Sequence, residues 1–320
     1  MKEDYIYGVA RVHVREAELL NRQDIEQLLT ATSYDDAVQM LAEKGYTGDD
    51  SKIENLISAR RKSLWEFLQE LGVSPQQLSM FRADIDFHNL KVAVKSQILS
   101  EDAEMFMMDF GNIAPKQIQK AVQERDFSDL PSIMGRAGQN ALDILLKTRD
   151  GQLCDVILDR AALESVYKAG RDSDIPLVRE YVKLKTALTD IKIAVRCCLT
   201  EKSLDFIDRA LAVCEGLDVH ALALAAAKDL EAVYTCLFST EYDGAVAALK
   251  ESMSAFEKWC DNQVMQLIRQ EKSKCSTLSP IIAYLLAVEN EMKIVRLILS
   301  GKKNQLEENL IRERVRELYG

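Results

Sequence analysis

The sequence of 320 residues predicts an all-α protein, and three observations support this fold class. Only 5 prolines and 13 glycines occur, which is fewer than strands joined by tight turns would need. Apolar residues recur at helical spacing along almost the whole chain. No segment shows the sustained polar–apolar alternation of a half-buried strand. A hydrophobic content of 48% with 29% charged residues indicates a folded, globular chain.

Several helix starts are marked in the sequence. Ser33 stands three residues before Asp36, which is a plausible cap spacing for a helix that follows it. Four prolines stand where the first turn of a helix tolerates them: Pro75, Pro131, Pro176 and Pro280. Ser279, directly before Pro280, is the strongest predicted cap among the residues that precede these prolines.

One short phrase recurs three times, as DFHNLKVAVK at 86–95, DIKIAVR at 190–196 and ENEMKIVRLI at 289–298. Two sets of residues keep a spacing of about 101: Asn89, Asp190 and Glu291, and then Lys91, Lys192 and Lys293. Solenoid units are shorter, at roughly 20–50 residues, whereas about 100 residues suit a small helical domain. The repeat therefore predicts three similar helical domains, at 1–100, 101–205 and 206–320.

As a helix, the first copy carries a polar stripe between two apolar flanks, made of Asp84, His88, Lys91 and Lys95. The second copy carries Lys185, Thr189, Lys192 and Arg196 in the same way. In the third copy the stripe holds either Lys293 with Leu297 or Met292 with Arg296, depending on the frame. Two interpretations stay open: a solvated or ion-paired helix face with basic stems over apolar neighbours, or a shared surface for a partner.

The sequence gives no positive signal for a cofactor, metal or catalytic site. Gly301-Lys302 lacks the other residues of a phosphate-binding loop, and no dinucleotide-binding glycine motif occurs. The three histidines, His13, His88 and His220, are isolated from one another and from cysteine pairs. Asp155 and Asp159 stand at i and i+4, a spacing that could serve acid–base chemistry, a hard cation, a solvated face or pairing with the basic stripe. We therefore expect no catalytic residue, cofactor or small-molecule substrate.

Charge, cysteine usage and hydropathy limit the expected partners and cellular location of the chain. A net charge of −10 with no strong basic run argues against nucleic acid as a partner. Seven cysteines without a CxxC motif fit free thiols in a reducing cytoplasm, although Cys197-Cys198 could be redox-active. The start MKEDY is polar, so no signal peptide is expected. The apolar run STLSPIIAYLLAV is shorter than the ~20 residues of a membrane-spanning helix, so any membrane role is expected to be peripheral.

Both ends of the sequence offer further candidates. Tyr5, Tyr7 and Arg11, in YIYGVAR, are residue types that anchor interfaces, and packing of a first helix is an equal alternative. The segment EENLIRERVREL predicts a solvated amphipathic helix whose apolar side includes Leu310, Ile311, Val315 and Leu318.

The closing run SPIIAYLLAVENEMKIVRLILSGKKNQLEENLIRERVRELYG resembles the end of the C subunit of V/A-type ATPases, the family to which the d subunit of eukaryotic V-ATPases is related. The shared features, in order, are Pro280, Ala283-Tyr284-Leu285, Glu289, Glu291, Arg296, Ile298-Leu299, Gly301-Lys302, Ile311-Arg312-Glu313-Arg314 and Leu318-Tyr319. YIYGVARV, FRADIDFHNLK, DFSDLP and the Asp155/Asp159 segment are also similar to that family, so the resemblance extends over essentially the whole chain.

The resemblance implies a funnel-shaped arrangement of three similar helical domains about a pseudo-threefold axis. It implies a non-catalytic central-stalk subunit, one copy per complex, at the cytoplasmic face of the membrane. Its partners would be the other stalk proteins and the membrane proteolipid ring, so that ATP turnover is coupled to H⁺ or Na⁺ transport. The residues that could meet such partners are Lys91, Lys95, Lys192, Arg196, Arg296, Tyr5, Tyr7 and Arg11. A generic helical adaptor without a rotary role is the alternative.

Overall fold

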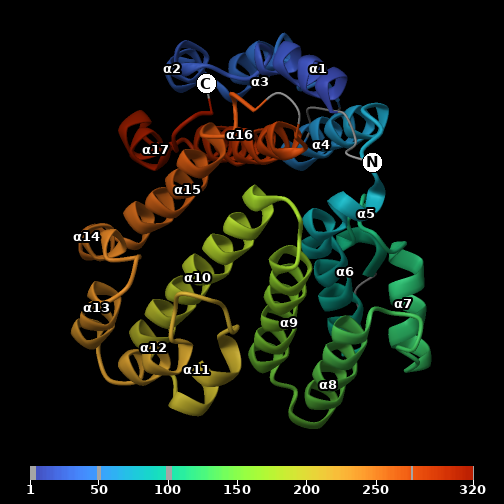
Figure 1. Ribbon diagram of the computed structural model, residues 1–320, viewed down its shortest axis with the longest axis vertical. Coiled ribbons are helices and arrows are strands. Elements are labelled where there is room, and N and C mark those ends of the chain that lie inside the picture. Colours follow the sequence, from blue (N-terminus) through green and yellow to red (C-terminus); the bar gives the residue numbers. More distant parts are fainter. Residues whose placement is uncertain (1–4, 49–51, 99–102, 275–276, 320) are drawn as a thin grey trace. The chain divides into compact units, whose positions relative to one another are not determined.

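The computed structural model describes residues 5–48, 52–98, 103–274 and 277–319 (Figure 1). Helices are the regular elements of these ranges, which contain no strand and a single β-bridge between Cys214 and Leu217. The all-α prediction is confirmed. The chain divides into two compact units. Unit 1 is built from the described residues of Met1–Val73, Ile175–Val178 and Ala247–Gly320, and unit 2 from those of Ser74–Asp174 and Arg179–Val246.

Unit 1 is organised around one buried helix, α16 (Ser279–Lys303). Its other complete helices are α1 (Ile6–Glu16), α2 (Arg22–Thr30), α3 (Tyr34–Ala42), α4 (Ile53–Glu70), α15 (Met253–Arg269) and α17 (Glu308–Arg314). Helix α16 packs against α1, α3, α4, α15 and α17, as Figure 1 shows. Because neighbours enclose it on most sides, its sequence is apolar nearly all the way round, which is the pattern of a core helix.

The predicted helix starts in unit 1 have mixed outcomes. The hydroxyl of Ser33 accepts a hydrogen bond from the backbone N–H of Asp36, so Ser33 caps α3 as predicted. The prediction for Ser279 is wrong, because Ser279 is already the first residue of α16 and the cap position is Leu278. Ser74 instead supplies the cap next to a proline, since it forms a reciprocal capping box with Gln77 at the start of α5 (Pro75–Leu78) in unit 2.

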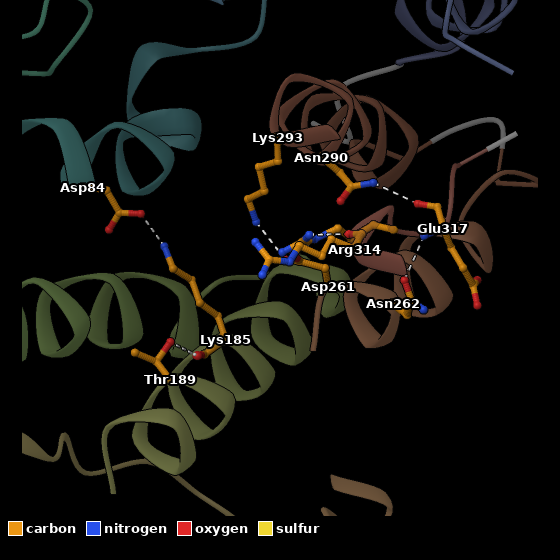
Figure 2. Close-up of polar contacts among 10 residues, drawn as sticks. Asp84, Lys185, Thr189, Asp261, Asn262, Asn290, Lys293, Arg314 and Glu317 are labelled. Atoms are coloured by element: carbon orange, nitrogen blue, oxygen red, sulfur yellow. Dashed lines mark hydrogen bonds and ion pairs between the residues drawn. The ribbon is translucent and has the colours of Figure 1, made fainter. Parts of the chain in front are cut away.

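The C-terminal segment is shorter as a helix than the sequence predicted. Helix α17 ends at Arg314, so Val315 and Leu318 lie after it. Two amides of unit 1 hold this tail (Figure 2): Asn290 Nδ2 donates to the Glu317 carbonyl at 3.0 Å, and Asn262 Oδ1 accepts from the Glu317 N–H at 2.9 Å. Side-chain partners thus satisfy the tail's backbone where helical hydrogen bonds stop.

Unit 2 is a second helical body. Its elements are α5, η1 (Ser79–Arg82), α6 (Ala83–Lys95), η2 (Ala103–Phe106), α7 (Pro115–Glu124), α8 (Ser132–Thr148), α9 (Gly151–Arg171), residues 179–199 of α10 (Pro176–Leu199), α11 (Leu204–Ala210), α12 (Val219–Ala226) and α13 (Leu230–Phe238). The remaining helix, α14 (Gly244–Glu251), crosses the boundary in sequence between the two units. Helices α8 and α9 lie side by side, and α6 packs on α7, α8 and α9 (Figure 1). Leu90, Leu145 and Leu158 are fully buried in the core that these helices share.

One glycine of unit 2 permits an unusually close contact between helices. A Cβ atom on Gly170 of α9 would lie 2.3 Å from a methyl carbon of Val182 on α10. Real Cβ atoms do not approach other atoms this closely, so only glycine fits without movement of one helix. The closeness of α9 and α10 therefore depends on the missing side chain of Gly170.

Candidate functional site

The basic stripe of the first copy is ion-paired. Lys91 Nζ lies 2.6 Å from Asp159 Oδ1 and 3.9 Å from Asp155, and Lys95 Nζ lies 2.7 Å from Asp155. The two aspartates lie on α9 and the two lysines on α6. Asp155 and Asp159 are therefore partners for the basic stripe, one of the interpretations that their spacing left open. His88, on the same stripe, hydrogen bonds through Nε2 to the carbonyl of Phe106 at 3.0 Å.

The stripe of the second copy lies on α10. Lys185 Nζ lies 2.5 Å from Asp84 Oδ2, and the hydroxyl of Thr189 donates to the carbonyl of Lys185 at 2.7 Å, as Figure 2 shows. Asp84 belongs to the stripe of the first copy, so one residue from each of the two stripes joins α6 to α10 within unit 2. Lys192 is half-buried and Arg196 is exposed.

In the third copy the surface positions combine one residue from each of the two frames that the sequence left open. Lys293 and Arg296 both reach the surface, whereas Met292 is buried. Lys293 Nζ lies 2.9 Å from Asp261 Oδ1, while Arg316 Nε lies 2.9 Å from Asp261 Oδ2. Figure 2 shows Lys293 reaching from α16 toward Asp261. Burial acts to raise the pKa of Asp261, but Lys293 and Arg316 outweigh it and hold that pKa below its usual value.

Arg296 carries the second cationic contact of α16. Its Nε and one Nη donate to the two carboxylate oxygens of Glu54 on α4, at 3.0 and 2.8 Å. Such a bidentate pair fixes the orientation of both side chains. Across the three copies, the stripe residues Lys91, Lys95, Lys185, Lys293 and Arg296 all connect one helix to another within their own unit. The ion-paired interpretation therefore describes them, and a partner surface made of the same residues stays a prediction.

Near the N-terminus, Arg11 contacts two residues of α4. Its Nη2 lies 2.7 Å from Glu70 Oε2, and the guanidinium lies 5.2 Å from the centre of the Phe67 ring. Tyr5 is half-buried, whereas 71% of Tyr7 is exposed, with its ring 6.0 Å from the same guanidinium. Arg11 thus secures the packing of the first helix, and Tyr7 is the aromatic residue that faces outward.

Helix α1 leaves an apolar stripe on its exposed side. Tyr7 and Val14 are 71% and 70% exposed, and Ala10 and Ala17 are exposed between and after them. These residues follow the spacing i, i+3, i+7 and i+10, which is that of the contact line between two packed helices. Exposed apolar side chains in a row are typical of an interaction surface. We define this row, Tyr7, Ala10, Val14 and Ala17, as the α1 stripe.

The repeated position of Asn89, Asp190 and Glu291 proves to be buried in all three copies, with exposures of 0%, 0% and 4%. Asn89 on α6 forms a closed pair of hydrogen bonds with one residue: Oδ1 accepts from the Met108 N–H and Nδ2 donates to the Met108 carbonyl, both at 2.8 Å. Asp190 on α10 accepts the N–H of Ala212 at 3.0 Å. Each side chain therefore clamps the backbone of a loop to the repeated helix.

In unit 1, Glu291 also clamps a loop backbone to the repeated helix, and it does so as part of a charged cluster. Oε2 accepts the N–H of Leu20 at 2.6 Å, while Oε1 accepts from the Tyr46 hydroxyl at 2.9 Å and from Arg60 Nη2 at 3.2 Å. Burial raises the pKa of Glu291, although the charge of Arg60 and the hydrogen bonds from Leu20, Tyr46 and Arg60 favour its ionised form. Burial acts to lower the pKa of Arg60, but Glu291, Tyr46 and Tyr284 together outweigh it and raise the pKa of that guanidinium, so Arg60 stays charged.

A groove of about 580 Å³ opens in unit 2 between one face of α8 and one face of α9. Its lining residues are Ile133, Arg136, Ala137, Asn140, Ile144, Ile157, Arg160, Ala161, Glu164 and Arg209. Three guanidinium groups over an apolar floor suit a ligand with an anionic and an apolar part. However, Arg160 is paired with Glu164 at 2.7 Å and Arg209 with Asp205 at 3.1 Å, so the groove is less positive than its arginines alone would make it.

Neither metal binding nor thiol chemistry gains support from the geometry. Within the described ranges, no cluster of three His, Cys, Asp or Glu side chains could hold a metal ion. Cys197 and Cys198 are both free thiols, and burial raises the pKa of each. A raised pKa disfavours the reactive thiolate, so the structural interpretation of this pair is favoured over the redox one.

Comparison with known protein families determines the family to which the chain belongs. The profile described as "ATP synthase (C/AC39) subunit" matches residues 8–314, which is nearly the whole chain. The chain belongs to the ATP synthase (C/AC39) subunit family. The resemblance to the C subunit of V/A-type ATPases that the sequence motifs indicated is thereby confirmed.

Of three relatives, two match over nearly the whole chain and the third over about three fifths of it. The C subunit of the V-type sodium ATPase of Enterococcus hirae is 22% identical, over 95% of this chain and 96% of the relative. The C subunit of the A-type ATP synthase of Methanocaldococcus jannaschii is 24% identical, over 98% of this chain and 86% of the relative. The C subunit of the V-type ATP synthase of Thermus thermophilus is 22% identical over 61% of this chain and 64% of the relative.

Two further structural findings bear on this C/AC39 chain. In the part of the chain that the structure describes, no helix combines the length and apolar character needed to cross a bilayer.

The loop-clamping role of Asn89, Asp190 and Glu291 was missed by the sequence reasoning, which used these residues only as markers of the repeat. The signal that could have found it is a polar residue kept in register on the apolar side of three otherwise buried helices.

Proposed function

We propose that this chain is a non-catalytic central-stalk subunit that joins the rotating stalk of a V/A-type ATPase/ATP synthase to the membrane proteolipid ring. ATP hydrolysis or synthesis in the complex would thereby be coupled to H⁺ or Na⁺ transport. The observation that carries this proposal is the family match over residues 8–314, together with relatives named as the C subunits of V-type and A-type enzymes along nearly their whole length.

The internal construction of each unit supports a torque-transmitting role. A coupler must resist deformation, and close-packed helices have low compressibility. In unit 1, bonds from Glu291 and Arg296 tie α16 to elements more than 200 residues earlier in the chain. In unit 2, Lys91, Lys95 and Lys185 connect α6 with α9 and α10. Such cross-links restrict sliding of one helix along another.

The socket in this proposal consists of the three repeated domains, 1–100, 101–205 and 206–320, around a pseudo-threefold axis. Support comes from the three buried polar residues that stand about 101 residues apart and each hold a loop backbone. One copy of the chain would occupy each complex, at the cytoplasmic face of the membrane, and it would carry no nucleotide or other cofactor of its own.

The partner-facing residues in this proposal are surface side chains of the α1 stripe, of α10 and of the ion pairs described above. The α1 stripe offers Tyr7 and Val14 as exposed apolar contacts. Arg196 offers an exposed cation on α10, with Lys192 half-buried beside it. Lys91, Lys95, Arg296 and Arg11 would contribute as members of existing ion pairs. An exposed ion pair is worth little to stability, so a partner's carboxylate can compete for its cation.

The coupling role is tested with membranes from a strain that lacks this chain. We expect ATP-driven ion pumping to be lost while the soluble head still hydrolyses ATP, and we expect added wild-type chain to restore pumping. Pumping at the normal rate without the chain would contradict the proposal and favour a generic adaptor. The purified chain alone should hydrolyse no ATP, and measurable turnover by it would contradict the non-catalytic assignment.

A further inference from the structure

The three buried clamp residues differ in how completely their polar atoms are satisfied. Asn89 uses its carbonyl oxygen and its amide nitrogen on the same residue, Met108. Both carboxylate oxygens of Glu291 receive donors. Asp190 receives the Ala212 N–H on Oδ1, whereas its Oδ2 has no hydrogen-bond partner among the described residues, although the side chain is 0% exposed.

The surroundings of Asp190 do not favour a negative charge. Arg160 and Glu164 of α9 act on it in opposite directions, and Cys214 lies in the segment that follows the Ala212 clamp. One turn earlier on α10 lies Thr186, whose buried hydroxyl is likewise without a hydrogen-bond partner in the described structure. Burial raises the pKa of Asp190 to about 7, against the opposing effects of the Ala212 N–H and Arg160. A buried carboxylate with a single donor is costly to keep ionised.

We propose that Asp190 is a proton-binding residue, held in the folded chain as the neutral acid. Its acid hydrogen makes the side chain a hydrogen-bond donor as well as an acceptor, as the amide of Asn89 is toward Met108. The folded chain, in which the loop from Leu211 to Leu217 is held on α10, is most stable while the proton is bound. The copy at Asn89 makes the same clamp without a titrating group, and the copy at Glu291 makes it with a charged partner, Arg60. This proposal is independent of the coupling role.

The pH dependence follows from the difference between the folded and unfolded states. The unfolded chain loses the Asp190 proton near the ordinary value of 3.8, and the folded chain keeps it to about 7. Between these values the folded state binds more protons, so its stability falls as pH rises through the window and levels off above it. Within the window the contribution of Asp190 to the unfolding constant rises about tenfold per pH unit.

The first experiment compares urea unfolding of the full chain and Asp190→Asn at pH 5, 6, 7 and 8. We expect the ratio of the wild-type to the variant unfolding constant to rise about tenfold per unit up to pH 7 and then level off. Asn89→Asp is the matched variant, because it gives the first copy the residue of the second. The unfolding constant of Asn89→Asp, relative to that of wild type, should acquire a similar dependence on pH. A ratio for Asp190→Asn that is constant over this range would overturn the proposal.

The second experiment reads the proton in the unmodified chain and does not require the variant to fold. In the full chain labelled with ¹³C at aspartate side-chain carboxyls, one carboxyl resonance should keep the shift of a protonated acid at pH 6 and titrate near 7. Amide hydrogen exchange at Ala212, after correction for the intrinsic rate, should lose protection relative to Met108 as pH rises toward 7 and should level off above it. If all carboxyls are ionised by pH 6, Asp190 does not hold a proton and the inference is wrong.

Discussion

The guanidinium of Arg60 and the carboxylate of Glu291 meet at 3.2 Å in the interior of unit 1, where their side chains are 6% and 4% exposed. They lie 231 residues apart in the sequence. The same carboxylate holds the Leu20 N–H, so one acidic side chain joins α4, α16 and the loop after α1. Removal of Glu291 would leave the Arg60 charge buried without its carboxylate.

We expect Glu291→Ala to destabilise the chain by about 3–5 kcal/mol, because Arg60 would keep its charge in a buried site. Urea unfolding at pH 7 measures this. Glu54→Ala is the matched control, because it removes the carboxylate of an exposed pair with the same helix. It should cost about 0.2–1 kcal/mol. Equal losses for the two variants would show that the buried cluster has no special role in stability.

Gly170 and Gly151 stand on the same helix and allow a matched comparison. Gly170→Ala should destabilise by about 1–3 kcal/mol, because the new methyl group would overlap Val182. Gly151→Ala meets no atom within 4 Å and should be neutral or stabilising by up to about 1 kcal/mol. Adding Val182→Ala to Gly170→Ala should recover part of the loss in thermal unfolding. Absence of any recovery would mean that the cost arises elsewhere.

Asp261 should contribute stability that depends on pH. Lys293 and Arg316 hold its pKa below the usual value in the folded chain, so the contribution is present above pH 3.8 and is lost as pH falls through the folded-state pKa. Asp261→Asn should therefore be less stable than wild type at pH 7, with the difference shrinking toward pH 3. Asp172→Asn, at an exposed pair with Arg171, is the control and should change stability little. A difference for Asp261→Asn that persists undiminished at pH 3 would argue against ion pairing as the cause.

The pairing of Lys91 with Asp159 predicts the outcome of a charge exchange. Lys91→Glu alone should lower stability by about 0.5–1 kcal/mol, since it places three carboxylates together. Adding Asp159→Lys should restore most of that loss in a double-mutant cycle. The same pair of variants separates the two interpretations of the stripe. Suppose that binding to the stalk and ring falls in both the single and the double variant, although the double variant recovers its stability. Lys91 itself then contacts a partner.

The α1 stripe predicts a binding defect without a folding defect. Tyr7→Ser with Val14→Ser changes two side chains that are 71% and 70% exposed, so unfolding should shift by no more than about 0.5 kcal/mol. Assembly of the variant with the other proteins of the ATPase should weaken, as measured by co-purification from membranes. Ala10 and Ala17 provide the reference: Ala10→Ser/Ala17→Ser should weaken assembly less. Unchanged co-purification of the Tyr7/Val14 variant would remove the stripe from the set of candidate contacts.

Much of the architecture followed from local sequence. Helical spacing and sparse glycine and proline predicted the all-α fold, and Ser33 was identified as a cap because its hydrogen bond to Asp36 is local. The aspartates at 155 and 159 were among the possible partners of the stripe for a similar reason, because i, i+4 spacing places both on one face.

Other features depend on packing between distant segments, which sequence patterns do not encode. Lys185 pairs with Asp84, which lies 101 residues earlier in the sequence, and Glu291 hydrogen bonds to Leu20, which lies 271 residues earlier. The frame of the third copy was ambiguous, because helix rotation is set by the neighbours of α16 rather than by its own periodicity. At Ser279 the local cap rule was wrong because the helix begins one residue earlier than the Ser-Pro pair suggests.

The chemistry of the repeated clamp gives the two units different responses to temperature. The cost of removing ions from water falls as temperature rises, so the Arg60–Glu291 cluster in unit 1 becomes relatively more favourable in the heat. The neutral bonds between Asn89 and Met108 in unit 2 gain no such advantage. Substitutions at one structurally repeated position can therefore adjust the heat tolerance of one unit without altering the other, which offers a route to thermal adaptation that leaves the fold unchanged.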